Sequence, residues 1–304
     1  MKVAGIDIGG TSIKGMVIDD HGKMLHSLKI DTESSLGRDH IVENLKKIVG
    51  ELHSAHQDIA GVGIGTAGRV NVATGEVVYA TANLPGWQGT NVKKIIEHHL
   101  NLPVVVDNDA NTALMGEQWL GAGRNLKDIT MLTLGTGVGG ANLVNGEIFR
   151  GAHWSGGEWG HVILIPNGLP CNCGQKGCME QYLSGNALVR FAEKATNQSY
   201  ESGVKVMEDY QNSRKEIVSV IEEYIAHLSV VITNLSNGLD PQAVIIGGGV
   251  IESKEFWWDA FLKALKKSAV PVEVRPALLG NMAGSIGAAK LIIDTIRNTH
   301  ENGF

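Results

Sequence analysis

The chain has 304 residues, the length of one large or two moderate domains. Hydrophobic residues make up 43% and charged residues 19%, which is ordinary for a globular protein and unlike a disordered one. The net charge of −6 argues against a broad basic surface for nucleic acid or an anionic membrane, so small molecules are the expected partners.

No stretch approaches the ~20 apolar residues that a transmembrane helix needs. Asp7 also interrupts the N-terminal apolar run before a secretory signal could form. We therefore predict a cytoplasmic protein that binds neither membrane nor nucleic acid.

The N-terminal segment predicts strands around a glycine turn. An apolar run from Val3 to Asp7 is followed by Gly9 and Gly10, and alternating segments follow over residues 15–19 and 24–30. Bare backbone N–H groups in such a turn can hold a phosphate, and an acid at the strand end can hold its magnesium ion.

Further along, apolar residues at helical spacing predict a helix over residues 41–52. Strands are expected at 61–65 and 103–106. A helix is expected at 114–120.

The pattern of the N-terminus then returns. A strand at 129–134 leads into the glycine loop 135–140, and an Asn145-Gly146 turn predicts a hairpin after it. We interpret the chain as internally duplicated.

The remaining pattern favours helices at 187–195, 217–235 and 286–296, with a strand at 243–246 that ends in three glycines. Strands that alternate with helices predict an α/β protein. Two similar halves suggest two lobes with a cleft, with a boundary near residue 120.

The glycine loop 135–140 also matches the G-x-G-x-x-G pattern of dinucleotide-binding enzymes, with Glu158 near the expected acidic position. That site requires a helix directly after the glycines. Here a hairpin is expected, which argues against a nicotinamide-dependent oxidoreductase. Any one glycine loop could be a simple tight turn, but three loops at strand ends favour a nucleotide.

The three cysteines of the chain all lie between residues 171 and 178. In a reducing compartment such crowding favours a metal site over a disulfide. The plain alternative is three small buried thiols and a surface histidine.

Several of these motifs occur in the order seen in the ROK family (repressors, open reading frames and sugar kinases), and the resemblance covers essentially the whole chain. The motifs are Asp7-x-Gly9-Gly10-Thr11, Asn108-Asp109-x-Asn111, the loop 135–140, His161 with the cysteines, and Gly247-Gly248-Gly249.

The resemblance implies an actin/hexokinase-like (ribonuclease H-like) duplicated α/β fold in which ATP and sugar meet in a cleft. Its N-terminal lobe would be residues 1–120, completed by a C-terminal helix at 286–297, and would bind sugar and phosphate. Its C-terminal lobe, residues 121–285, would hold the zinc loop and bind the nucleotide. Family analogy also suggests a homodimer.

The implied activity is the transfer of the ATP γ-phosphate to the 6-hydroxyl of a hexose or N-acetylhexosamine, with Mg²⁺ as cofactor and Asp109 as general base. The residues that match the family's sugar contacts are Gly68, Asn108, Asp109, Glu158, His161 and Glu180. The residues that match its phosphate, magnesium and nucleotide contacts are Asp7, Gly9, Gly10, Thr11, Gly135, Thr136, Gly137, Gly247, Gly248 and Gly249.

The same resemblance implies a structural zinc ion on His161, Cys171, Cys173 and Cys178. Four protein ligands close a tetrahedral zinc site, which leaves no position for substrate. The ion would fix the loop that carries Glu158 and Glu180 at its two ends.

Alternatives remain open at this stage. Asp109 could be only a helix N-cap, the two glutamates could be solvated surface groups, and the chain could be a sugar-sensing regulator without catalysis. The first strand begins at Val3, so we expect no DNA-binding domain ahead of it. The segment 65–71 is similar to N-acetylmannosamine kinases, which places that sugar first, then glucose, then N-acetylglucosamine.

Overall fold

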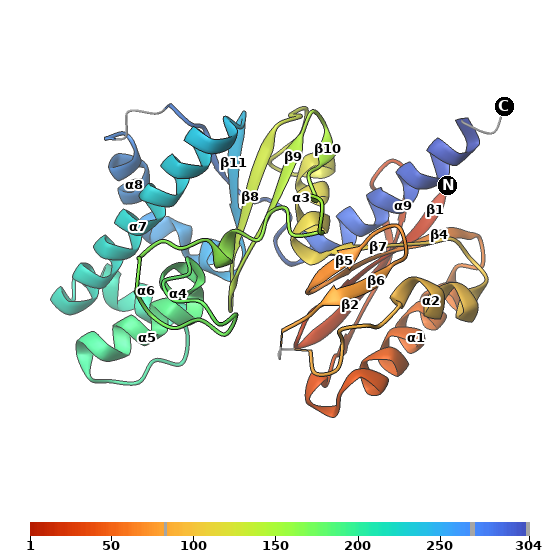
Figure 1. Ribbon diagram of the computed structural model, residues 1–304, viewed down its shortest axis with the longest axis horizontal. Coiled ribbons are helices and arrows are strands. Elements are labelled where there is room, and N and C mark those ends of the chain that lie inside the picture. Colours follow the sequence, from red (N-terminus) through yellow and green to blue (C-terminus); the bar gives the residue numbers. More distant parts are fainter. Residues whose placement is uncertain (82–83, 268–270, 302–304) are drawn as a thin grey trace. The chain divides into compact units, whose positions relative to one another are not determined.

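The computed structural model describes residues 1–81, 84–267 and 271–301, and the chain divides into two compact units (Figure 1). Unit 1 consists of Met1–Asn125, Arg150–Gly156 and Leu278–Phe304, and unit 2 of Leu126–Phe149 and Gly157–Ala277. The short segment 150–156 therefore belongs to unit 1, although the chain on both sides of it belongs to unit 2.

Unit 1 is built on a five-stranded sheet of order β3-β2-β1-β4-β7. Strands β1, β2 and β3 pair antiparallel, whereas β1, β4 and β7 run parallel. The elements of this unit are β1 (Lys2–Ile8), β2 (Ser12–Asp19), β3 (Met24–Asp31), α1 (Arg38–Ala55), β4 (Ile59–Thr66), β5 (Arg69–Asn71), β6 (Glu76–Tyr79), α2 (Val92–Leu100), β7 (Val104–Asn108), α3 (Asp109–Leu120) and α9 (Ala283–Glu301), with single 3₁₀ turns η1 (Ser34–Leu36) and η4 (Gly280–Met282).

Unit 2 repeats this plan with a sheet of order β10-β9-β8-β11-β12. Antiparallel β8–β10 correspond to β1–β3, and parallel β8, β11 and β12 correspond to β1, β4 and β7. The elements are β8 (Ile129–Leu134), β9 (Val138–Val144), β10 (Glu147–Ile148), η2 (Trp159–His161), α4 (Glu180–Leu183), α5 (Gly185–Thr196), α6 (Gly203–Gln211), α7 (Lys215–Leu239), β11 (Ala243–Gly247), η3 (Gly249–Ser253), α8 (Lys254–Leu265) and β12 (Val274–Pro276). The shared strand order is the duplication that the sequence predicts.

One face of the unit 1 sheet packs on α1. The residues at helical spacing that predicted this helix are all buried: Ile41, Leu45, Ile48, Val49 and Leu52. They form one hydrophobic cluster with the even-numbered residues of β1, namely Ala4, Ile6 and Ile8. The two periodicities therefore meet as expected, 3.6 residues on the helix and 2 on the strand.

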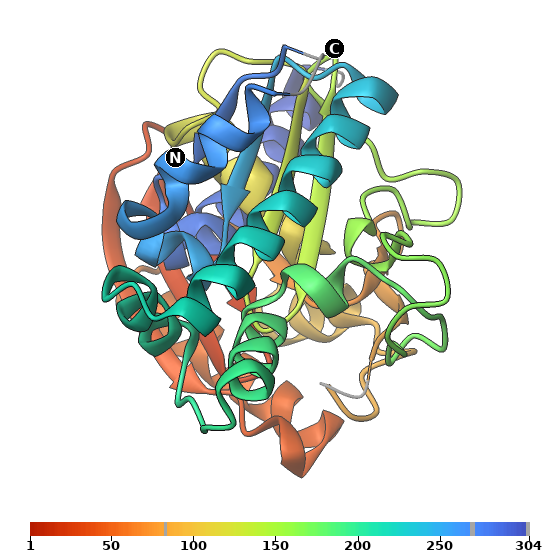
Figure 2. The ribbon, with the colours of Figure 1, turned by 90° about the vertical axis from the view of Figure 1, so that its left-hand side faces the viewer.

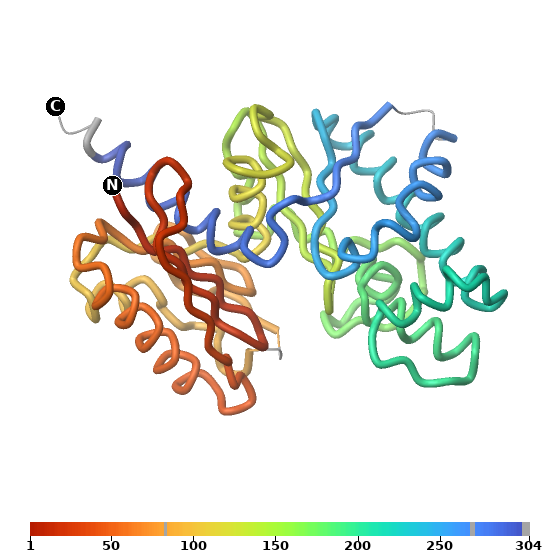
Figure 3. Tube along the Cα trace, turned by 180° about the vertical axis from the view of Figure 1, so that it is seen from behind, coloured from red at the N-terminus to blue at the C-terminus, as the bar shows by residue number. Residues whose placement is uncertain are grey.

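The opposite face of the same sheet packs on α9, which lies beside β1 and β2 in Figure 3. This face has almost no side chains near its centre. A Cβ atom on Gly5 would lie 2.0 Å from the Ser285 carbonyl oxygen, and one on Gly63 would lie 1.8 Å from the Ala288 carbonyl oxygen. The helix backbone therefore rests directly on the strand backbones.

Helices α3 and α9 also approach each other through glycines. A Cβ atom on Gly116 would lie 2.3 Å from the Ala283 oxygen, and one on Gly287 only 1.7 Å from the Thr112 oxygen. Because α3 starts at the end of β7, this contact fixes the helix that begins with Asp109.

The core of unit 2 forms around α7, which lies across its sheet (Figure 2). Trp257 of α8 is fully buried in this core, and Phe256 and Trp258 pack partly buried against it. The aromatic cluster 256–258 thus serves packing within the unit. In the described part of the chain, no helix has the length and apolar composition to cross a membrane.

The close helix–sheet contact predicts a large cost for adding one methyl group. We expect Gly63→Ala to lower the free energy of unfolding by about 3 kcal/mol, because α9 must move away from β4. Gly238→Ala is the matched control. No atom lies within 4 Å of a Cβ at this exposed position of α7, and alanine should add about 0.5–1 kcal/mol there. Urea unfolding measures both, and a Gly63→Ala protein as stable as the wild type would contradict the packing.

Candidate functional site

Two hydrogen bonds from Thr32 hold the turn between β1 and β2. The Gly9 N–H donates to the Ser12 carbonyl (3.1 Å), and the buried Thr32 hydroxyl donates to the Gly9 carbonyl (2.6 Å). The Thr32 N–H donates in turn to the Thr11 carbonyl (2.9 Å). Gly10 and Thr11 stay exposed, so their N–H groups and the Thr11 hydroxyl are available to a phosphate on a rigid turn. No sequence motif pointed to Thr32, because its partners lie more than twenty residues earlier in the chain.

Asp7 is the last residue but one of β1, on the face of the sheet that meets the first turn of α9. A Cβ atom on Gly284 would lie 2.8 Å from its carboxyl carbon, so only glycine allows the helix to approach the acid this closely. Burial is the main reason that the pKa of Asp7 rises to about 6, followed by the negative charge of Asp109, while Lys14 opposes the rise. The two predicted carboxylates, Asp7 and Asp109, are therefore neighbours within unit 1.

The start of α3 holds Asp109 in a defined backbone position. Asn108 is the N-cap, and its Oδ1 accepts the N–H groups of Ala110 (2.9 Å) and Asn111 (3.2 Å). The Asn108 Nδ2 donates to the Gly68 carbonyl (2.9 Å). The structure thus brings the predicted residues Gly68, Asn108 and Asp109 together. Asn108, and not Asp109, is the N-cap residue, and the Asp109 Oδ1 also accepts the Ala110 N–H (2.9 Å).

Gly68 lies in the turn between β4 and β5 with φ +100, a conformation that favours glycine. A Cβ atom there would lie 2.4 Å from the Tyr79 carbonyl oxygen. Glycine at this position therefore lets the turn and the β5–β6 hairpin close tightly beside Asn108.

Glu117 of α3 is a buried carboxylate that the sequence analysis missed. It accepts the N–H groups of Ala122 (2.7 Å) and Leu279 (2.8 Å), and also that of Leu278. These donors lie in the segments that end the first stretch of unit 1 and begin its last. No local pattern could reveal the donors Leu278 and Leu279, since they lie far from Glu117 in the chain.

In unit 2 the glycine loops after β8 and β11 lie at the same end of adjacent parallel strands. The Gly135 N–H donates to the Gly137 carbonyl (2.9 Å), and the Gly185 N–H at the start of α5 donates to the Gly135 carbonyl (2.7 Å). Gly248 has φ +86, and a Cβ on it would lie 2.5 Å from Leu134 backbone atoms. The predicted nucleotide residues of this unit, Gly135 to Gly137 and Gly247 to Gly249, are therefore brought together.

β9 begins at Val138, so the last three residues of the predicted glycine loop 135–140 belong to this strand, which turns through Asn145 (φ 53) and Gly146 (φ 84) into β10. This is the predicted hairpin. A dinucleotide fingerprint needs a helix at this point, so the observed strand argues against the oxidoreductase.

His161 and the three cysteines form the one group of potential metal ligands found among the described residues, and their ligand atoms all lie within 4.8 Å of one another. The His161 Nδ1 lies 3.8 Å from the Cys171 Sγ, and the Cys173 and Cys178 sulfurs are 3.6 Å apart. Zn–S bonds of about 2.3 Å in a tetrahedron place two sulfurs about 3.8 Å apart. The cluster is therefore compatible with a structural zinc ion.

The chemistry of the cluster also suits a cation. Burial raises the pKa of the Cys178 thiol, and the neighbouring Cys173 and Cys171 raise it further. A thiolate there needs a positive charge to balance it, and a metal ion supplies one. The loop is already shaped for this, since the Cys171 N–H donates to the Gln175 carbonyl (2.8 Å) and the Gln175 Nε2 to the His161 carbonyl (3.3 Å).

The predicted acids flank this cysteine loop as expected from their positions in the chain. Glu158 caps η2, where the His161 N–H donates to its carbonyl (3.1 Å). Glu180 starts α4, and its Oε2 accepts the Val138 N–H (3.1 Å) beside Gly137. Glu180 thus connects the cysteine loop to the glycine loop of unit 2.

Comparison with known proteins shows the family of the chain. A family model described as the ROK family matches residues 3–295. The chain belongs to the ROK family. A glucokinase from Halalkalibacterium halodurans is 35% identical over an alignment of 316 positions, which covers 95% of this chain and 94% of that protein.

Two solved structures resemble this ROK protein over nearly its full length. A ROK family glucokinase from Streptomyces griseus, in complex with glucose and AMPPNP, is 34% identical with a TM-score of 0.84 and covers 96% of this chain and 99% of its own. A ROK hexokinase from Thermus thermophilus is 30% identical with a TM-score of 0.85. The match covers 97% of this chain and 100% of the hexokinase chain. The predicted α/β, actin-like ATPase fold is confirmed.

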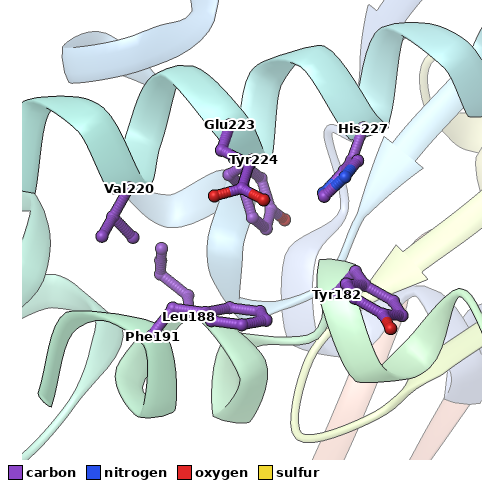
Figure 4. A pocket seen from close by; sticks show the side chains of 7 residues that line it. All are labelled: Tyr182, Leu188, Phe191, Val220, Glu223, Tyr224 and His227. Carbon is purple, nitrogen blue, oxygen red and sulfur yellow. The ribbon is translucent and has the colours of Figure 1, made fainter. Parts of the chain in front are cut away.

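This ROK protein also has a small apolar pocket between α5 and α7 (Figure 4). Its cavity volume of about 10 Å³ is that of one water molecule, too small for sugar or nucleotide. Tyr182 at its edge accepts the Leu169 N–H (2.8 Å) through its hydroxyl and contacts His227 edge to face. The pocket therefore belongs to the packing behind the cysteine loop.

The raised pKa of Asp7 predicts a pH-dependent stability. Its folded pKa of about 6 lies above the ordinary value of 3.8, so its contribution is full below pH 3.8 and is lost as the pH rises through 6. We expect Asp7→Asn to stabilise this ROK protein by about 2 kcal/mol at pH 7.5 and by roughly half of that at pH 5. Urea unfolding between pH 5 and 8, without divalent cations, measures the difference. A gain that does not vary with pH would contradict the shift.

Proposed function

We propose that the protein is an ATP-dependent sugar kinase that transfers the γ-phosphate to the 6-hydroxyl of a hexose or N-acetylhexosamine. The observation that carries the proposal is the carboxylate of Asp109, held at the capped start of α3 beside Asp7, in a member of the ROK family. The similarity to a glucokinase and to a ROK hexokinase supports it.

Asp109 is the proposed general base. It accepts the proton of the sugar hydroxyl as that oxygen attacks the γ-phosphorus atom in line, and the bond from phosphorus to the β,γ-bridging oxygen breaks. Because phosphoryl transfer passes through a loose transition state, little proton removal is needed early, and positioning and charge neutralisation dominate. An ionised carboxylate fixed by the backbone of α3 meets that need.

The proposed groups for ATP are the amide-rich turns described above. Gly10 and Thr11 offer N–H groups and a hydroxyl to phosphate on a turn that the Gly9 N–H closes. Thr136 and Gly137 offer a second such turn, which the Gly135 N–H closes. The backbone of Gly248 and Gly249 is exposed, and without side chains it allows the flat base of the nucleotide to approach closely. Asp7 is the proposed holder of Mg²⁺, an ion that prefers carboxylate oxygens and neutralises phosphate charge.

The proposed sugar contacts are Gly68, Asn108, Asp109, Glu158, His161 and Glu180. A zinc ion on His161, Cys171, Cys173 and Cys178 would be structural, since four protein ligands leave no open position. His161 would then offer its second ring nitrogen to a sugar hydroxyl.

Among sugars we propose N-acetylmannosamine first, then glucose, then N-acetylglucosamine. The first choice rests on the resemblance of residues 65–71, and the relatives named glucokinase support glucose. Steady-state kinetics with the three sugars rank them.

The rival function is a sugar-sensing regulator, which would bind sugar without releasing ADP. The homodimer stays a prediction.

Loss of the base should separate binding from turnover. We expect Asp109→Asn to lower kcat by about 10²–10⁴-fold, because the hydroxyl proton loses its acceptor. The sugar dissociation constant should stay within about threefold of the wild type, since the amide keeps the shape and a hydrogen bond. Asp39→Asn, at an exposed position of α1, is the control. Near wild-type turnover of Asp109→Asn refutes the assignment.

Loss of the metal should loosen the sugar site. We expect Cys173→Ser, which removes one of the four proposed zinc ligands, to lower zinc affinity by more than the roughly 10–100-fold that the loss of a ligand's hydrogen-bond partner costs. Sugar binding should weaken as well, because Glu158, His161 and Glu180 lose a fixed loop. Elemental analysis measures zinc and calorimetry measures sugar binding. Lys176→Ala, an exposed change in the same loop, should keep both. Unchanged sugar affinity in a zinc-free Cys173→Ser protein would overturn the structural role.

A further inference from the structure

The segment Arg150–Gly156 lies in unit 1, although β10 before it and η2 after it belong to unit 2. Its first residue makes a buried ion pair in unit 1. The Arg150 Nε and Nη2 both donate to the Asp107 Oδ2, at 2.9 and 2.6 Å. Asp107 is only 1% exposed, so the guanidinium is needed to balance a carboxylate that water does not reach.

The other oxygen of Asp107 organises the start of α3. Its Oδ1 accepts the Asn108 backbone N–H (2.7 Å) and the Asn111 Nδ2 (2.8 Å). Asn111 is itself buried, and its Oδ1 makes no hydrogen bond to the described residues. Asp107 is therefore the group that holds this amide.

These contacts fix the residues that come before and after Asp109 in the chain. Asp107 fixes the backbone at Asn108 before it and the side chain of Asn111 after it. Asn108 in turn caps the helix and holds the Gly68 turn. We propose that Arg150 is a positioning residue for phosphoryl transfer: its guanidinium keeps Asp107 in place, and Asp107 sets the backbone that aims Asp109.

Charge alone does not fulfil this role. The arginine fork places two N–H groups on one carboxylate oxygen, which leaves the second oxygen free to serve Asn108 and Asn111. A lysine would supply the charge from a single point, with weaker control of the carboxylate plane. The proposal rests on the kinase function proposed above, and its role is distinct from substrate binding because Arg150 acts through Asp107.

The test compares Arg150→Met, Arg150→Lys and the control Arg297→Met. Arg297 pairs with Asp20 at the surface of the same unit. We expect Arg150→Met to lower kcat by about 10–100-fold, the size of a small misplacement of a reacting group, with little change in the sugar KM. Arg150→Lys should recover part of kcat, and Arg297→Met should match the wild type.

Hydrogen exchange of the backbone amides supplies a readout that does not depend on activity. The N–H groups of Ala110 and Asn111, which Asn108 caps, should exchange faster in Arg150→Met than in Arg297→Met. A normal kcat per folded enzyme, a change confined to KM, or unchanged exchange in residues 108–112 would overturn the proposal. If the wild type phosphorylates no sugar, the kinase function fails, and exchange alone decides whether Arg150 positions the start of α3. If Arg150→Met does not fold, kcat and hydrogen exchange are both measured on Arg150→Lys instead.

Discussion

The structure of unit 1 depends on a face of its sheet that has no side chains where two helices must lie. Gly5, Gly63 and Gly65 leave the strand backbones open, and α9 and α3 rest on them at distances that a single Cβ atom would forbid. This contact brings the first turn of α9 onto Asp7 and fixes the helix that begins with Asp109. Glycine loses more backbone entropy on folding than any other residue. Here it allows α9 to pack directly beside the two neighbouring acids, Asp7 and Asp109.

Two buried carboxylates then use backbone N–H groups to hold the segments around α3. Asp107 acts at the start of the helix, and Glu117 acts near its end, where it collects the N–H groups of Ala122, Leu278 and Leu279. Buried acids are stable only when such donors or a cation satisfy them. The helix that carries the proposed base is therefore held at both ends by buried carboxylates.

Local patterns predicted the parts of the fold that depend on neighbours in the chain. The periodicity of α1, the Asn145-Gly146 hairpin and the repeated strand–glycine–strand order are all confirmed. The site residues came from motif resemblance, and the structure brings Gly68, Asn108 and Asp109 together. Thr32, Glu117 and Arg150 were missed, because each acts through hydrogen bonds to distant segments. A threonine or an arginine in a sequence carries no sign of its partner.

In the proposed reaction, this ROK protein moves the terminal phosphate of ATP to the oxygen on carbon 6 of a sugar. Phosphorus NMR tests this reaction directly, with the wild-type protein, ATP, magnesium and each of the three proposed sugars, beside glucose that lacks the 6-hydroxyl. We expect a new phosphate ester with at least one complete sugar and none with 6-deoxyglucose. ADP without a sugar ester, no reaction with any sugar, or an ester on the deoxy analogue would contradict it.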